Sequence, residues 1–155
     1  MSLKQLQFSE QIPADLETVW NFFSSPVNLA KITPAEMQFI ITSDFNEHTK
    51  MFPGMLITYK VAPVLNIKMN WVTEITHMQE KSYFIDEQRI GPFAFWHHLH
   101  QFEENKDGVL MKDTLYYDVG MSIAGAFADA VMVNRRVKNI FAYRSRKISE
   151  LFIKK

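Results

Sequence analysis

The sequence predicts one α+β domain in which a curved, seven-stranded antiparallel sheet surrounds a long C-terminal helix, with two short helices between the first two strands. Two observations support this fold class. From Met37 to Val119 the apolar residues recur with a period of two, which is typical of half-buried strands. From Ser122 to about Lys154 the chain lacks proline and its apolar residues recur at helical spacing. Because such a helix needs a broad apolar surface, we expect a concave sheet against it.

The composition fits a single domain over residues 1–155. The chain is 47% apolar and contains no cysteine, so disulfides, thiol catalysis and cysteine zinc sites are excluded. Its 17 basic and 17 acidic residues give no net charge, which disfavours a globally basic nucleic-acid-binding protein. The N-terminal ten residues lack the features of a secretory signal, and no apolar run is long enough to span a bilayer. We therefore expect a cytoplasmic protein without stable membrane insertion.

The first third of the chain predicts a strand and two short helices. Leu3–Ile12 alternates as a strand and is ended by Pro13. Asp15–Ser24 has apolar residues at helical spacing, including Trp20, and is followed by proline. A second short helix is expected over Asn28–Ile32, before the next proline.

Six further strands follow, separated by turn residues. We expect them at Met37–Asp44, Leu56–Ala62, Ile67–Thr76, Ser82–Arg89, Phe95–Glu103 and Val109–Val119. A hairpin that pairs Glu104 with Val109 around the four-residue loop 105–108 sets the register of the last two strands. The resulting inward pairs are Trp96 with Tyr117, His98 with Leu115, His100 with Asp113, and Phe102 with Met111. In the hairpin before it, Phe84, Asp86 and Gln88 are expected inward, beside Ile75, Thr73 and Trp71.

A row of polar side chains is thus expected to cross an apolar chamber. His98 and His100 project to the same side of one strand, with Asp113 opposite His100. Four interpretations of these three residues stay open: a self-satisfied hydrogen-bond cluster, a ligand-orienting group, a metal site, or a general acid–base pair.

Arg144 stands out on the long helix because it falls within the apolar arc, whereas Arg135 and Arg136 fall opposite. It could pair with Asp86 or Asp113, reach water at the end of the chamber, or anchor a carboxylate or phosphate group of a ligand. Eight of the 17 basic residues lie between Arg135 and Lys155, and a solvated helix face is the expected explanation.

Many aromatic side chains are expected to face inward, where they either fill the core or line a chamber. They are Trp20, Tyr59, Trp71, Phe84, Trp96, Tyr117, Phe127 and Phe141.

Several local strings accompany this order of elements. They are Ile12-Pro13-Ala14 before Val19-Trp20, Asn28-Leu29 with Ile32-Thr33-Pro34, Gly54-Met55 before Tyr59, Asp86-Glu87-Gln88 before Gly91-Pro92-Phe93, Trp96-x-His98-x-His100-x-Phe102, and Ile140-Phe141-x-Tyr143-Arg144. With these strings, the chain resembles the START-like superfamily, also called SRPBCC or helix-grip, and within it a bacterial branch related to polyketide cyclase/dehydrase-like proteins. The resemblance implies a deep apolar cavity between helix and sheet, but no single reaction.

We therefore expect a protein that binds a small lipophilic ligand, such as a lipid, a sterol or a polyketide-like molecule, in a cavity between the sheet and the C-terminal helix. An enzyme of cyclase, dehydratase or hydrolase type acting on such a ligand is the alternative, and an interaction module with a filled chamber is a third hypothesis. No metal, cofactor or nucleic acid is expected, and the sequence does not indicate a protein partner. The expected ligand-binding residues are Tyr59, Trp71, Asp86, Gln88, Trp96, His98, His100, Asp113, Tyr117, Phe127, Phe141 and Arg144.

Overall fold

The computed structural model describes residues 3–62, 67–120 and 130–153, and they form one antiparallel sheet packed against helices. The strands are β1 (Lys4–Ile12), β2 (Ile40–Ile41), β3 (Leu56–Val61), β4 (Met69–Gln79), β5 (Tyr83–Ile90), β6 (Phe95–Asn105) and β7 (Gly108–Asp118). The helices are α1 (Leu16–Phe23), α3 (Ala130–Leu151) and the 3-10 helices η1 (Pro26–Ile32) and η2 (Ala35–Met37). The strand order is β1-β7-β6-β5-β4-β3-β2, which confirms the predicted α+β fold with seven strands.

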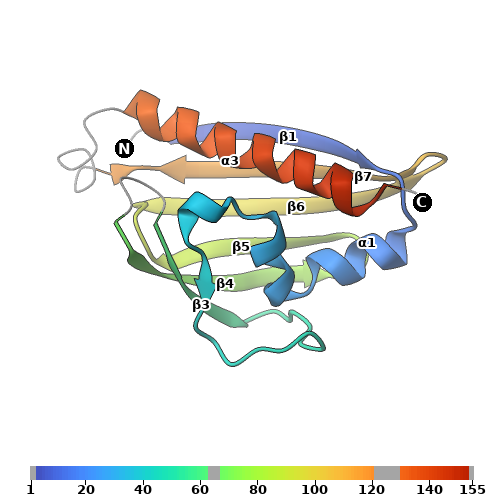
Figure 1. Ribbon diagram of the computed structural model, residues 1–155, viewed down its shortest axis with the longest axis horizontal. Coiled ribbons are helices and arrows are strands. Elements are labelled where there is room, and N and C mark those ends of the chain that lie inside the picture. Colours follow the sequence, from blue (N-terminus) through green and yellow to red (C-terminus); the bar gives the residue numbers. More distant parts are fainter. Residues whose placement is uncertain (1–2, 63–66, 121–129, 154–155) are drawn as a thin grey trace.

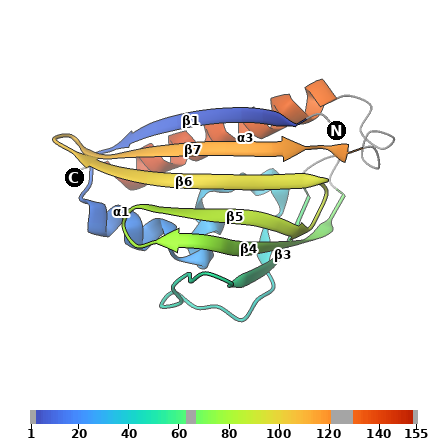
Figure 2. The same cartoon turned by 180° about the vertical axis from the view of Figure 1, so that it is seen from behind.

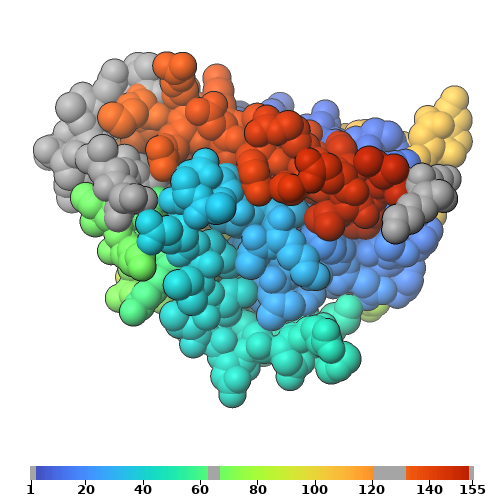
Figure 3. Space-filling model, viewed as in Figure 1, coloured from blue at the N-terminus to red at the C-terminus, as the bar shows by residue number. Residues whose placement is uncertain are grey.

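All helices lie on one face of the sheet, as Figure 1 shows. The opposite face is uncovered in the view from behind (Figure 2). In the space-filling view, α3 and the residues of η1 lie edge to edge over the covered face (Figure 3), and the two elements are in contact. Among the described residues, no helix is both long enough and apolar enough to cross a lipid bilayer.

The long helix α3 is fixed to β1, at one side of the sheet. The rings of Phe8 on β1 and Phe141 on α3 stack with their centroids 4.0 Å apart. Glu10 on β1 accepts hydrogen bonds from the hydroxyls of Ser145 and Ser149 on the same face of α3. Because these contacts hold the helix over β1, the middle strands of the sheet must be covered by other groups.

The short segments after β1 agree with the prediction for α1 but differ after it. Asp15 caps α1 by accepting a 2.8 Å hydrogen bond from the amide of Thr18. The second helix is a 3-10 helix that begins at Pro26 instead of Asn28. The strand predicted over Met37–Asp44 is only two residues long, because the amides of residues 42 and 43 both turn toward the carbonyl of residue 58.

The register predicted for the last hairpin is confirmed. His98 pairs with Leu115 and His100 pairs with Asp113. The connecting loop is shorter than predicted, because Asn105 and Gly108 also pair and leave only residues 106 and 107 in the turn. The observed turn is shorter than the predicted loop by one residue at each end, so the register of the two strands is the predicted one.

The register predicted for the hairpin of β4 and β5 is wrong by two residues at Asp86 and Gln88, and by three at Phe84, which pairs with Met78 beyond the second irregularity. Asp86 pairs with Ile75 and Gln88 pairs with Thr73. Irregularities between residues 72 and 73 and between residues 75 and 77 shift the strands, and β4 continues to Gln79, through part of the expected loop. A shift of two residues leaves Asp86 and Gln88 on their predicted face.

The C-terminal helix was predicted over Ser122–Lys154. Within the described residues it spans Ala130–Leu151 and so ends three residues early. The predicted part before Ala130, including Phe127, lies outside the described residues.

Gly108 begins β7 with a φ of +122°, and a Cβ atom there would lie 2.2 Å from the carbonyl oxygen of Ile12. Gly54 has a φ of +88° and open space around it. Replacing Gly54 with alanine should cost about 1–2 kcal/mol of unfolding free energy from backbone strain alone. Gly108→Ala should lower the free energy of unfolding clearly more, because the added Cβ would also push away the carbonyl of Ile12 at the end of β1. Urea unfolding of both variants measures the difference, and equal losses would contradict the proposed close approach.

Candidate ligand-binding site

A pocket lies between the concave face of the sheet, η1 and α3, with a cavity volume of about 160 Å³. At about 10–15 Å³ per enclosed water molecule, this space would hold roughly ten waters. Its walls come from α1, η1, β3, β4, β5, β6 and α3, whereas β1 and β7 contribute no lining residue. The aromatic side chains therefore do not fill the chamber completely.

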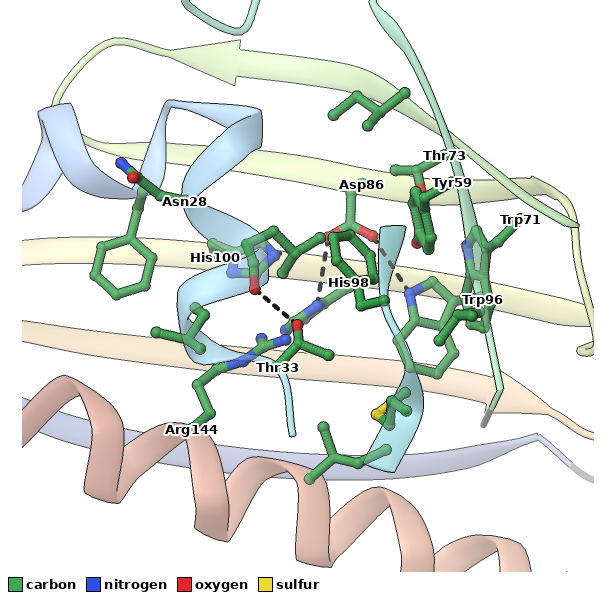
Figure 4. A pocket seen from close by; sticks show the side chains of 18 of the residues that line it. Asn28, Thr33, Tyr59, Trp71, Thr73, Asp86, Trp96, His98, His100 and Arg144 are labelled. Carbon is green, nitrogen blue, oxygen red and sulfur yellow. Dashed lines mark hydrogen bonds and ion pairs between the residues drawn. The ribbon is translucent and has the colours of Figure 1, made fainter. Parts of the chain in front are cut away.

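The apolar wall is built around Trp71 on β4, whose side chain alternates inward with its neighbours on the strand. Its ring stacks on Tyr59 from β3 at 5.8 Å and meets Trp96 from β6 edge-on at 5.4 Å. Phe93, from the turn between β5 and β6, contacts both tryptophans. Figure 4 shows Tyr59, Trp71 and Trp96 gathered at one side of the pocket.

Gln88 does not line the pocket, although it was among the expected ligand-binding residues. Its side-chain amide donates to the carbonyl of Phe93 at 2.6 Å, and its oxygen accepts from the amide of the same residue at 3.2 Å. Gln88 thereby fixes Phe93 against the aromatic wall. The sequence analysis named Phe93 only within the string Gly91-Pro92-Phe93 and missed it as a lining residue.

Two histidines and two aspartates form a buried cluster across β5, β6 and β7, which we call the His–Asp cluster (His98, His100, Asp86 and Asp113). His98 lies 2.9 Å from Asp113 through Nε2 and 3.3 Å from Asp86 through Nδ1. His100 lies 2.7 Å from Asp86 through Nε2 and 2.8 Å from Asp113 through Nδ1, although this last contact lacks hydrogen-bond geometry. Each histidine therefore contacts both carboxylates.

The carboxylate of Asp86 also accepts a 3.3 Å hydrogen bond from the indole of Trp96 (Figure 4). Asp86, His98 and His100 line the pocket, and Asp113 lies behind the two rings, outside the lining. The cluster was expected only in part, because the sequence analysis set no register between β5 and β6, and it is this pairing that places Asp86 opposite His98.

Burial and charge pairing act in opposite directions on these groups. Burial lowers the pKa of His98, but hydrogen bonds with Asp113 and Asp86 and their negative charges outweigh it and raise the pKa to about 9. Burial raises the pKa values of Asp86 and Asp113, and the hydrogen bonds from the two histidines reverse this and hold both well below the ordinary range. At neutral pH the His98 imidazolium thus faces two carboxylates.

The ligand atoms of Asp86, His98 and His100 all lie within 4.8 Å of one another, so these side chains could hold a metal ion. The same atoms make direct nitrogen–oxygen contacts of 2.7 and 3.3 Å. A metal would have to replace these ion pairs and the protons that they hold.

Arg144 projects from α3 into the pocket, where Phe141 also lies (Figure 4). Its guanidinium carbon lies 5.0 Å from the centroid of the Phe141 ring. Its Nε atom is buried and has no hydrogen-bond partner in the described part of the chain. Neither Asp86 nor Asp113 pairs with it, because both carboxylates contact the histidines.

Tyr59 and Tyr117 occupy different positions. Tyr59 lines the pocket and its hydroxyl lies 3.0 Å from that of Thr73, while burial raises its pKa. Tyr117 is fully buried beneath α3, donates to Asn134 at 3.2 Å, and does not line the pocket.

Sequence reasoning also missed lining residues from the short helices and from α3. Leu29, Ile32 and Thr33 come from η1 and the residue after it, where short-range periodicity does not define a face. Arg136 was expected on the outer face of the long helix, but it lines the pocket and is half-buried. The error arises because α3 packs toward β1 and turns the flank of its apolar face toward the cavity.

Replacing Asp113 with asparagine should destabilise the protein by about 3–5 kcal/mol, because it removes the nearer of the two carboxylates that pair with the buried His98 imidazolium. Glu103→Gln is a matched control, since Glu103 lies on β6 and forms an exposed ion pair with Lys112 of β7. It should cost less than about 1 kcal/mol. Urea unfolding at pH 7 measures both, and a loss at Asp113 no larger than the control would contradict the charge pairing.

The raised pKa of His98 also predicts a pH dependence of stability. Below the unfolded value of 6.5 the stabilisation is fully present, and it should be lost as the pH rises toward about 9. The two aspartates, whose pKa values are depressed, should contribute above about pH 4 and lose their contribution in acid. The urea midpoint should therefore fall between pH 6.5 and 9, and a flat profile over this range would contradict the assignment.

Comparison of the sequence with family models and with curated proteins finds no match. Comparison of the fold with solved structures finds many. Protein CV1439 from Chromobacterium violaceum has a TM-score of 0.71 and 11% identity, over 97% of this chain and 99% of that chain. Major latex-like protein 151 from Panax ginseng has a TM-score of 0.69 and 14% identity, over 98% and 99%.

The AHSA1-like protein from Aeromonas hydrophila has a TM-score of 0.63 and 13% identity, over 96% of this chain and 94% of that chain. These similarities extend over nearly the full sheet and the long helix, at identities that carry information on the fold alone. The chain therefore has the same helix-grip fold as these proteins.

Proposed function

We propose that the protein binds a small lipophilic molecule in the pocket between β3–β6, η1 and α3. The supporting observation is the pocket itself, an interior space lined mainly by aliphatic and aromatic side chains with a few convergent polar groups. Sites for small lipophilic ligands commonly have this composition. A helix-grip fold favours such a pocket, because a curved sheet and a helix fixed near one edge do not close the space between them.

A ligand with a flat ring system would suit the aromatic wall. The rings of Tyr59 and Trp71 lie nearly parallel, with an interplanar angle of 17°, and Trp96 stands perpendicular to Trp71. Such surfaces contact planar rings and alkyl chains alike. A lipid, a sterol or a polyketide-like molecule is the ligand class that we propose.

An enzyme acting on the same ligand is the second candidate, since His98, His100 and Asp86 line the pocket and could transfer a proton. The observation against it is that both ring nitrogens of each histidine lie within 3.3 Å of a carboxylate oxygen. The rings are therefore occupied within the His–Asp cluster, which supports binding over catalysis.

Titration with N-phenyl-1-naphthylamine, a neutral dye that fluoresces in apolar surroundings, tests the binding proposal. Dialysed protein should bind one dye per chain saturably. Val137→Phe, on the pocket wall of α3, should weaken binding at least about tenfold by filling space, a difference of about 1.4 kcal/mol. Lys138→Phe, on the exposed neighbouring position, should not.

Near-ultraviolet circular dichroism and the urea midpoint establish that each variant is folded. Ile57→Phe, on the sheet side of the pocket, serves as a second filled variant if Val137→Phe does not fold. Dye binding that does not saturate, or that is equal in wild type and in a folded filled variant, would contradict the proposal.

A further inference from the structure

Three polar atoms at the pocket wall are buried and have neither a hydrogen-bond partner nor an ion-pair partner among the described residues, whereas a fourth, Nδ1 of His100, lies 2.8 Å from Asp113. The three are Nε of Arg144, Nε1 of Trp71 and Oγ of Ser25. Trp71 and Ser25 are only 6% and 4% exposed, so bulk water does not satisfy them. The arginine and the tryptophan are donors only, and the serine hydroxyl can donate. The pocket wall therefore carries hydrogen-bond donors that a bound ligand could satisfy.

Arg144 is the one of these three that carries a full charge. It forms no ion pair with a carboxylate of the described residues. Asp86, which lines the same pocket, already contacts both histidines and Trp96. Glu10, which contacts α3, accepts hydrogen bonds from Ser145 and Ser149. The positive charge is thus left facing the cavity, beside the ring of Phe141.

The charge of Arg144 acts on the pocket interior and not only on the protein surface. Burial raises the pKa of the Tyr59 hydroxyl on β3 and the charge of Asp86 adds to this, while the charge of Arg144 acts in the opposite direction and reduces the rise. A charge whose inner nitrogen is removed from water is costly unless it is paired. An oxyanion that enters the pocket would repay this cost, because charge-assisted hydrogen bonds to a guanidinium are among the strongest in proteins.

We infer that the ligand is an amphiphilic oxyanion whose carboxylate, sulfonate or phosphate group binds Arg144 while its apolar part lies against the aromatic wall. This inference rests on the proposed function and adds the charge and the orientation of the ligand. A neutral lipophilic molecule would leave the buried Nε of the guanidinium without a partner. The acidic group faces α3 and the hydrophobic end faces β3 and β4.

A matched pair of dyes tests the inference. 1-Anilinonaphthalene-8-sulfonate and N-phenyl-1-naphthylamine share one aromatic body, and only the first carries a sulfonate, which is ionised at every pH used. Arg144→Gln should weaken binding of the sulfonate at least about tenfold and change binding of the neutral dye less than twofold. Arg146→Gln removes the same charge from an exposed position two residues away and should change neither.

The salt dependence of dye binding distinguishes binding at Arg144 in the pocket from binding to the exposed basic residues of α3. A pair with Arg144 inside the pocket should keep its selectivity at 0.5 M sodium chloride, whereas attraction to exposed charges is screened. Dodecanoate and dodecanol, used as competitors of the dyes, extend the comparison to a carboxylate. Arg144→Lys keeps the charge without the planar guanidinium and should recover part of the lost affinity.

The outcomes distinguish the two levels of the proposal. If wild type binds neither dye saturably, the proposed function itself fails. If wild type binds both dyes and Arg144→Gln weakens both equally, or neither, the binding function stands and the inference of an anionic ligand is overturned. If Arg144→Gln does not fold, the inference is tested with Arg144→Lys and with the relative affinities of wild type for dodecanoate and dodecanol. Equal affinity of wild type for the acid and the alcohol then overturns the inference.

Discussion

The pocket depends on where α3 is attached to the sheet. The ring stack of Phe8 with Phe141 and the hydrogen bonds from Ser145 and Ser149 to Glu10 hold the helix over β1. The hydrogen bond from Tyr117 to Asn134 adds a contact with β7. Among the described residues, α3 therefore packs mainly on η1 and β1. The space over β3 and β4 is closed by η1, and what is not filled there is the cavity.

The His–Asp cluster gives this cavity a polar centre that it would otherwise lack. It joins β5, β6 and β7 by charge-paired contacts and so stiffens the sheet below the pocket. Because the cluster satisfies its own charges, it offers little binding energy to a ligand. Arg144 differs, since it stands on the opposing helix with its charge unmatched. The same pocket thus contains a cluster whose charges are paired with one another and an arginine whose charge is not paired.

Much of the fold could be predicted from the sequence because one face of the sheet is buried. The hairpin loop that pairs Glu104 with Val109 set the register in which His100 pairs with Asp113, the alternation set the inward face, and the structure confirms this pairing. The pairing of β4 with β5 could not be predicted, since two irregularities move the register without changing which residues face inward. The two-residue strand β2 was overestimated because side chains of Ser43 and Thr58 replace the expected backbone ladder.

The site was predicted where it depends on strand faces and missed where it depends on packing. Tyr59, Trp71 and Asp86 line the pocket as alternation indicates, whereas the rotation of α3 that brings Arg136 to the wall depends on the attachment to β1. A helical wheel places residues around an axis but does not say which direction faces the sheet. Phe93 was missed because its inward position comes from two hydrogen bonds with Gln88, which leave no periodic signal.

The placement of the tryptophans has a practical consequence. The chain has three, and Trp71 and Trp96 line the cavity while Trp20 is packed in the core beside Phe84 and Phe102. Two of the three intrinsic fluorophores therefore sit where an occupant would touch them, and the third provides a constant background. The intrinsic tryptophan fluorescence of the protein should therefore report whether a ligand is bound in the cavity, without an added label.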